Sequence, residues 1–223
     1  MAANLFDLFD ACSPAAKDAF VEAAAVRFYK AGEVIYFQGD EGSSMFRLLE
    51  GAVRLSVSRA DGRELYFVML GAGDCFGISN YVDGLGRPQT AEARTDACLQ
   101  VVSSPALDRL TAQFPCFSRA VMKLLSNHMR FLIDLFADSS LNDLPERIAR
   151  RILTAADGND RPGPIDLSQS DIAHMVGASR QSVNKVLQQF QQERLIEIGY
   201  GGLTLLAPAR LREKVTLAGM SQD

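Results

Sequence analysis

The stretch VGASRQSVNKVLQQF, residues 176–190, places hydrogen-bond donors on one face of a predicted helix. Apolar residues recur at helical spacing and define the inward face. They are Val183, Val186, Leu187 and Phe190. The outward donors are Arg180, Gln181, Asn184 and Lys185. All four can reach base edges in the DNA major groove, and none is an acid that would repel phosphate. An ordinary solvated surface helix has a similar pattern, so the flanking elements must show whether this helix binds DNA.

Turn and capping signals surround this helix. Ser168, with Asp171 three residues later, can cap a preceding helix. Gly177 allows a sharp turn, and Ser179 can cap the second helix. The stretch LIEIGYGGLTLL, residues 195–206, then predicts a β-hairpin with Gly201 and Gly202 at its tip. Two short helices followed by a hairpin indicate a winged helix–turn–helix, and we expect the outward face to read DNA.

A longer helix is predicted upstream, over residues 112–139. One apolar strip steps by alternating three and four residues, which is typical of a two-stranded dimer seam. Its members are Met122, Leu125, Met129, Leu132 and Phe136. A second strip, formed by Leu124, Phe131 and Leu135, can pack on the neighbouring domain. The alternative is a single broad core face within a monomer. We place a hinge over residues 140–144.

The region from Gly32 to about Ser104 contains short β-rich segments separated by turns, with Asp61-Gly62 as a strong hairpin signal. This pattern suggests a β-roll or barrel, preceded by a helix over about residues 13–25. The predicted fold is therefore α+β. We assign residues 1–110 to a β-roll sensor domain, 111–141 to the dimerisation helix and hinge, and 142–223 to the DNA-binding domain.

Composition narrows the class of protein. The formal net charge is −4 and the pI about 5.3, so bulk charge does not favour nucleic acid. From residue 141 onward, ten basic residues balance ten acidic ones, and the first 140 residues carry the whole excess of acid. No apolar run approaches the roughly 20 residues that span a bilayer, and the N-terminus lacks signal-peptide features. We expect a cytoplasmic protein without a membrane partner.

Three longer segments resemble the cAMP receptor protein/FNR (Crp/Fnr) family of transcription regulators. GEVIYFQGDEGSSMFRLLEGAVRL resembles the start of a cyclic-nucleotide-binding β-roll. ERIARRIL and SQSDIAHMVGASRQSVNKVLQQFQQERLIEI resemble the family's helix–turn–helix domain. The resemblance covers nearly the whole chain in the family's order of roll, long helix and winged domain. It implies a homodimer that binds palindromic promoter DNA, contacts RNA polymerase and responds to an effector at the roll.

The resemblance also implies roles for residues of the second helix. Arg180 holds the place of the Arg that reads a guanine, Gln181 replaces a Glu, and Lys185 replaces an Arg. Gln can pair with adenine, so the base preference at that step is expected to change. Serines near the helix starts complete the predicted DNA-binding set, as caps or phosphate contacts. They are Ser168, Ser170, Ser179 and Ser182.

The ligand region departs from the family's cAMP pattern. In CFGISNYVDGLGRPQTAEART, the family's Gly is Gly77, but the ribose-binding Glu has become Ile78. The phosphate-binding Arg-Ser pair falls on Pro88 and Gln89, and Arg87 lies one residue away, where it could still reach an anion. We therefore expect cAMP not to be the effector, and a different small molecule, or none, to act here. The candidate effector residues are Gly77, Ile78, Ser79, Arg87, Gln89 and Thr90.

Other sensors and other classes of protein were weighed in the same way. No His precedes His128, which argues against a haem sensor. Cys12 is the only N-terminal cysteine, so neither an iron–sulfur cluster nor another metal site is expected. A thiol switch between Cys12 and Cys98 remains an alternative. No catalytic set of side chains indicates an enzyme. A regulatory module that acts through protein partners without binding DNA is the rival function.

Overall fold

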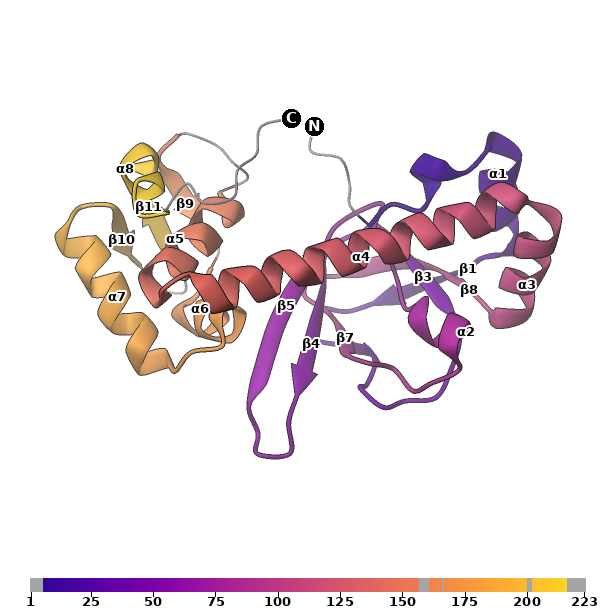
Figure 1. The fold of residues 1–223 in the computed structure, drawn as a ribbon, viewed down its shortest axis with the longest axis horizontal. Coiled ribbons are helices and arrows are strands. Elements are labelled where there is room, and N and C mark those ends of the chain that lie inside the picture. Colours follow the sequence, from indigo (N-terminus) through magenta and orange to yellow (C-terminus); the bar gives the residue numbers. More distant parts are fainter. Residues whose placement is uncertain (1–5, 157–160, 166, 200–201, 216–223) are drawn as a thin grey trace. The chain divides into compact units, whose positions relative to one another are not determined.

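The computed structural model describes residues 6–156, 161–165, 167–199 and 202–215, shown in Figure 1. The chain divides into two compact units, Met1–Ile133 and Asp134–Asp223. One helix, α4 (Pro115–Leu141), runs through the division, which lies ahead of the boundary expected near residue 142. Among the described residues, no helix is both long and apolar enough to cross a membrane.

The first unit contains the predicted β-roll, built from two four-stranded antiparallel sheets. The sheet orders are β1-β8-β3-β6 and β2-β7-β4-β5. The strands are β1 (Ala25–Tyr29), β2 (Val34–Tyr36), β3 (Met45–Glu50), β4 (Val53–Ser58), β5 (Glu64–Leu70), β6 (Cys75–Phe76), β7 (Thr90–Ala93) and β8 (Ala97–Val102). Gly62, with φ +81°, lies in the turn between β4 and β5, as the Asp-Gly signal predicts.

Two apolar clusters hold this unit together. One fills the space between the sheets, where Leu48, Val53 and Leu99 are fully buried. The other joins the roll to its helices through Phe20, which is also fully buried, and neighbouring side chains. Burying such side chains contributes about 1.5–3 kcal/mol each, before conformational entropy is subtracted. The roll is thus a rigid platform for the loops that connect its strands.

The helices of the first unit differ from expectation in one respect. A short turn, η1 (Phe9–Ala11), precedes α1 (Pro14–Ala23), and α2 (Ser79–Asp83) follows β6. The helix predicted over residues 112–139 begins as α4 at Pro115, and a separate helix, α3 (Ser104–Gln113), precedes it with a break between the two. The break falls at Phe114, which is extended with φ −124° and ψ +98°. Pro115 explains the break, because proline disfavours helical geometry in the residue before it and suits a first helical position.

The second unit surrounds its own apolar core. Its members with exposure at or near zero include Ile148, Ile152, Leu187 and Phe190. The elements after α4 are α5 (Leu144–Ala155), β9 (Gly163–Ile165), α6 (Gln169–Val176), α7 (Arg180–Gln192), β10 (Ile196–Ile198), β11 (Leu203–Leu205) and α8 (Pro208–Arg212). The sheet order is β10-β11-β9, so the predicted hairpin is present and has a third strand that was not predicted. Gly201, at the predicted tip, lies outside the described residues.

Candidate nucleic-acid interface

The first helix of the motif, α6, begins and ends as its sequence predicts. The Ser168 hydroxyl accepts from the Asp171 backbone N–H at 3.1 Å, and the Asp171 carboxylate accepts from the Ser168 backbone N–H at 3.2 Å. This reciprocal capping box satisfies two backbone donors that a helix start leaves free. Gly177 ends the helix in the left-handed region at φ +62°. Glycine has no Cβ to oppose that conformation, so the chain turns at once toward α7.

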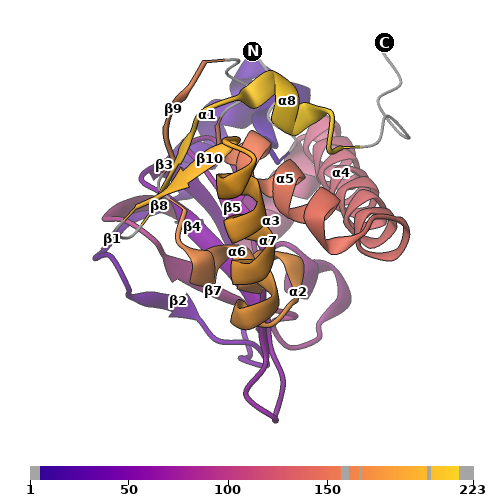
Figure 2. The same ribbon diagram turned by 90° about the vertical axis from the view of Figure 1, so that its left-hand side faces the viewer.

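The second helix, α7, is fixed by its cap and its buried face. The Ser179 hydroxyl accepts from the Ser182 backbone N–H at 3.1 Å and lies 2.8 Å from the Ser182 hydroxyl. Val183, Leu187 and Phe190 have no measurable exposure. Side chains three and four residues apart share one side of a helix, so this burial determines which residues face outward. Figure 2 views this unit from the side, with β10 following the end of α7.

The outward face of α7 carries the predicted DNA-binding side chains. Arg180, Gln181 and Lys185 are exposed, whereas Ser182 and Asn184 are half-buried. No acidic residue lies in the first turn of α7, where the helix dipole adds positive potential. Such a surface can donate hydrogen bonds to bases and attract phosphate. Ser168 and Ser170 lie at the start of α6 and are half-buried there.

The acidic residue next to α7 in the sequence is Glu193, its C-cap. Glu193 forms an ion pair with Lys214 at 2.8 Å. Lys214, together with a hydrogen bond from Gln189, holds the pKa of that carboxyl below its ordinary value. The carboxylate is therefore charged but has a neighbouring cation, and it lies at the opposite end of the helix from Arg180.

Two further side chains position the motif, and the sequence did not indicate them. Arg147 on α5 donates from Nη1 to the backbone carbonyl of Val176 at 3.0 Å, which anchors the C-terminal end of α6. Gln191 on α7 accepts from the Ile198 backbone N–H at 3.2 Å, which fastens the hairpin to the helix. Their sequence separations of 29 and 7 residues leave no local signal that would reveal these contacts.

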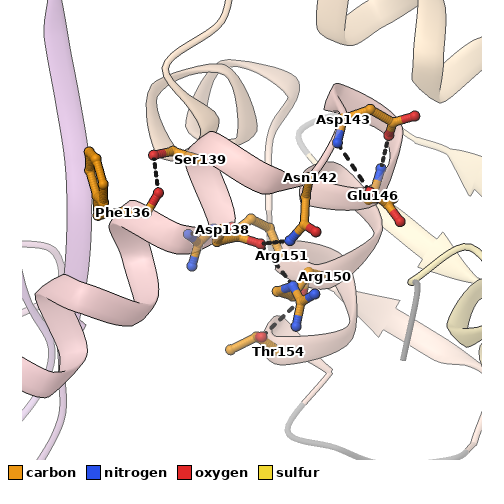
Figure 3. A network of polar contacts seen from close by, with 9 residues as sticks. All are labelled: Phe136, Asp138, Ser139, Asn142, Asp143, Glu146, Arg150, Arg151 and Thr154. Carbon is orange, nitrogen blue, oxygen red and sulfur yellow. Dashed lines mark hydrogen bonds and ion pairs between the residues drawn. The ribbon is translucent and has the colours of Figure 1, made fainter. Parts of the chain in front are cut away.

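A polar network, which we call the Asp138 network, joins the end of α4 to α5 (Figure 3). Asp138 forms ion pairs with Arg150 Nε at 2.9 Å and with Arg151 Nη2 at 3.4 Å. It also accepts from Asn142 Nδ2 at 2.7 Å. The Asp138 side chain is only 10% exposed, and α5 begins with a capping box between Asp143 and Glu146. Residues on both sides of the predicted hinge over 140–144 are thus fastened together.

The predicted dimer seam of α4 is largely open to solvent within the single chain. Met122 is 64% exposed, Phe136 is 72% exposed, and Met129 and Leu132 are also exposed. Leu125 is half-buried against the core of the first unit. In the second strip, Leu124 is buried, whereas Phe131 and Leu135 are half-buried. A contiguous apolar stripe on an exposed helix is a typical interaction surface.

The candidate effector residues lie just before α2, at its start and in the segment that leads from it into β7, with one unexpected arrangement. Arg87 is buried, and its Nη1 donates to the Gly77 carbonyl at 2.7 Å. Ile78 is 1% exposed, so an apolar side chain fills the position where the family has a ribose-binding carboxylate. Ser79 and Gln89 are half-buried, and the half-buried Thr90 accepts from the Gln38 backbone N–H at 3.0 Å.

The cysteines and histidines occupy different surroundings. Cys98 lies on β8 opposite Phe28, whereas Cys12 is in the N-terminal segment next to Ser13, whose hydroxyl is 3.5 Å from Cys116 Sγ. Burial raises the pKa of the Cys12 thiol to about 11, and the charge of Cys116 adds to the shift. His128 packs against the Phe6 ring at 5.0 Å, and burial lowers its pKa to about 4. Among the described residues, no group of three or more acidic, His or Cys side chains could hold a metal ion.

Comparison with known proteins gives consistent matches over both units. The family model for the cyclic nucleotide-binding domain matches residues 26–114, and that for the Crp-like helix-turn-helix domain matches residues 146–214. The transcriptional regulator LdrP of Thermus thermophilus is 33% identical over 187 residues, which cover 82% of this chain and 92% of that protein. The CRP-like cAMP-activated global transcriptional regulator of Mycobacterium tuberculosis is 27% identical over 197 residues, 86% of this chain and 88% of that protein.

A solved structure also supports the fold. The c-di-GMP responsive global regulator CLP of Xanthomonas campestris superposes with a TM-score of 0.77 at 20% identity, over 87% of this chain and 100% of that one. At this level of identity the likeness concerns the arrangement of helices and strands alone.

Proposed function

The chain belongs to the Crp/Fnr family of DNA-binding transcription regulators, and from this premise we propose that it binds promoter DNA as a homodimer through the outward face of α7. The observation that carries the proposal is the acid-free set of donors on α7, of which Arg180, Gln181 and Lys185 are exposed, on a helix that buries Val183, Leu187 and Phe190 on its other side. The family consists of transcription regulators rather than enzymes, and we assign no catalysis to this chain. Its proposed place of action is the cytoplasm, and RNA polymerase is its proposed protein partner.

Each side chain of the face has a proposed role. Arg180 donates hydrogen bonds from both terminal nitrogens to a guanine, and Gln181 pairs with an adenine through its donor and acceptor. Lys185 donates as a point charge, because it lacks the planar fork of an arginine. Asn184 lies between them and reaches a base edge or phosphate. The serines at the two helix starts assist by bringing backbone N–H groups to phosphate, as helix N-termini commonly do.

The dimer is proposed to form through α4. Its stripe of Met122, Leu125, Met129, Leu132 and Phe136, exposed except at the half-buried Leu125, would be covered by the same stripe of a second copy. Two-fold symmetry of the protein would then be matched by two-fold symmetry of the DNA site. We expect half-sites whose centres lie about 34 Å, or about 10 base pairs, apart.

The effector is proposed not to be cAMP. One relative is named as cAMP-activated and a structural neighbour as c-di-GMP responsive, so family membership does not specify one ligand. Here Ile78 cannot hold a ribose hydroxyl, and leaving that hydroxyl unpaired would cost about 1–3 kcal/mol. We propose that the region of Gly77, Ser79, Arg87, Gln89 and Thr90 controls the roll, with a different small molecule or with none.

Selection of bound duplexes from a random pool, with purified protein and no added ligand, tests the function. We expect an inverted repeat, and an affinity that falls steeply with salt because phosphate contacts release counterions. Arg180→Ala should weaken binding about 10-fold or more. Gln192→Ala, at the other end of α7, is the matched control and should bind like the wild type. A folded, dimeric protein that recovers no inverted repeat would contradict the proposal and favour a module that acts through protein partners.

A further inference from the structure

One cationic side chain lies inside the β-roll instead of at its surface. Arg87 is 4% exposed. Its backbone is pinned to the loop before β3, because its N–H donates to the Asp40 carbonyl at 2.9 Å and its carbonyl accepts from the Gly39 N–H at 2.8 Å. Charged residues are almost never buried to this extent without specific partners. The guanidinium must therefore have them.

Three oxygen atoms of the roll accept hydrogen bonds from the guanidinium. Nη1 donates to the Gly77 carbonyl at 2.7 Å and to Asn80 Oδ1 at 3.3 Å, and Nη2 donates to the Ser44 carbonyl at 2.9 Å. Ser44 precedes β3, whereas Gly77 and Asn80 belong to the stretch that leads from β6 into α2. One guanidinium thus connects that stretch to the start of β3, 43 residues from Arg87 along the chain.

Aromatic rings complete the surroundings. The guanidinium carbon lies 4.4 Å from the centroid of the Tyr36 ring and 5.4 Å from that of Phe46. Phe46 in turn stacks on Phe76, with ring centroids 5.1 Å apart. Cation–π contacts of this kind contribute most when water is excluded, as it is here. We call Tyr36, Ser44, Phe46, Gly77 and Asn80 the Arg87 cage.

The cage is shaped to a guanidinium. A Cβ at Gly77 would lie 2.7 Å from Arg87 Nη1 and 2.9 Å from Phe46 Cδ2, and the φ of +76° is itself one that side chains rarely adopt. Glycine at this position therefore permits both the backbone turn and the approach of the cation. Among the described residues, no carboxylate forms an ion pair with Arg87, so its partners are neutral dipoles and ring faces.

This arrangement leaves little for an external anion to bind. Arginine carries five N–H donors, and the two terminal nitrogens already serve three acceptors within the roll. A diffusible phosphate would have to break these hydrogen bonds and displace the stacked rings. A group that is covalently part of the chain meets no such cost, because it is present at its site at a very high effective concentration.

We propose that Arg87 is a built-in ligand of the β-roll: its side chain occupies the cage and holds the sensor domain in its DNA-binding state, so that no diffusible effector is required. The inference rests on the proposed function, since DNA binding is its readout. Removing the side chain empties the cage and shifts the population away from the competent state. A free small guanidinium should then act as an external ligand of the emptied cage.

Chemical complementation of Arg87→Ala tests the inference on the full chain. The wild type should bind the selected inverted repeat without any small molecule, and cAMP should change its affinity less than 2-fold. Arg87→Ala should bind at least 10-fold more weakly, and millimolar ethylguanidinium should restore binding with a saturable dose dependence. Ethylammonium, which lacks the planar fork, should not restore it. Arg59→Ala, at an exposed arginine of the β4–β5 turn, is the matched control and should behave as the wild type.

A second measurement does not depend on the folding of the variant. Phenylglyoxal modifies accessible guanidinium groups, and peptide mapping should find Arg87 at least 10-fold slower to react than Arg59. Equal rates would overturn the inference, as would a folded Arg87→Ala protein that binds DNA like the wild type. A wild type that binds DNA only after addition of a small molecule would also overturn it, while leaving the proposed function intact. A wild type that binds no duplex under any condition would overturn the proposed function even if Arg87 is protected.

Discussion

Replacing Asp138 by asparagine should loosen the attachment of α4 to α5. The change keeps the shape of the side chain and removes its charge. Arg150 and Arg151 would then face a neutral amide at 2.9 Å and 3.4 Å in place of a carboxylate. Asn142, which donates to the same carboxylate at 2.7 Å, would lose a charged acceptor. The ends of both helices should therefore open more often.

The magnitude follows from the burial of the partners. Exposed ion pairs contribute about 0–1 kcal/mol, whereas breaking a buried pair costs about 3–5 kcal/mol. Asp138 is 10% exposed, Arg151 19% and Arg150 34%, so the arginines can regain water more easily than a fully buried pair could. We expect a loss of about 2 kcal/mol in the local opening free energy. That corresponds to about a 30-fold increase in the opening constant, at 1.4 kcal/mol per factor of ten.

Native-state hydrogen exchange resolved by peptide is the appropriate assay, because a chain with two units has no single unfolding free energy. Protection of the amides in residues 136–152 should fall about 30-fold in Asp138→Asn, while protection in the β-roll should not change. Asp134→Asn, an exposed acid one turn earlier on α4, is the control and should lose less than 3-fold. Equal protection in Asp138→Asn and the wild type would refute the reasoning that this network fastens the two helices.

Three further predictions concern the interface and the thiols. Gln181→Glu should move the preferred base at one position of each half-site toward cytosine, worth about 1–3 kcal/mol; repeating the duplex selection checks this, and an unchanged base would contradict the assigned contact. Gly177→Ala should destabilise the second unit by about 1 kcal/mol because of its φ of +62°, whereas Gly71→Ala, which has open space and no left-handed φ, should not; thermal melting compares the two. A hydrogen bond from the Ser13 hydroxyl lowers the pKa of the Cys116 thiol, whereas burial raises the pKa of the Cys75 thiol to about 12. At pH 7, iodoacetamide should therefore label Cys116 first and Cys75 only after denaturation. Labelling in the reverse order would contradict both assignments.

The recognition motif could be predicted from the sequence because its signals are local. Each cap involves residues three apart, as in Ser168 with Asp171 and Ser179 with Ser182. The periodicity of α7 determines its faces within four turns, and the structure confirms Leu187 and Phe190 as fully buried. Capping and helical periodicity act over a few residues, so a single sequence carries them.

Other features could not be predicted, since they depend on residues that only folding brings together. The break between α3 and α4 was missed although Pro115 signals it, because apolar periodicity continues on both sides. The sequence of β9 has no strand pattern of its own, and β9 forms because it pairs with the edge of β11. The Asp138 network joins positions 12 and 13 residues apart across a change of helix, where spacing along the chain says nothing about distance.

Arg87 is the clearest example of a residue whose type was visible in the sequence but whose partners were not. The order of roll, long helix and winged motif, the outward donors of α7, and Ile78 in place of the family's ribose-binding carboxylate could all be predicted from the residues and their resemblance to the family. The same residues suggest that Arg87 could reach an anion. Its actual partners, the carbonyls of Ser44 and Gly77, 43 and 10 residues away, and the face of Tyr36, are known only from the folded chain. The reason is physical: a periodic pattern determines which way a side chain points, but the partners of a buried charge depend on how separate strands and loops pack around it.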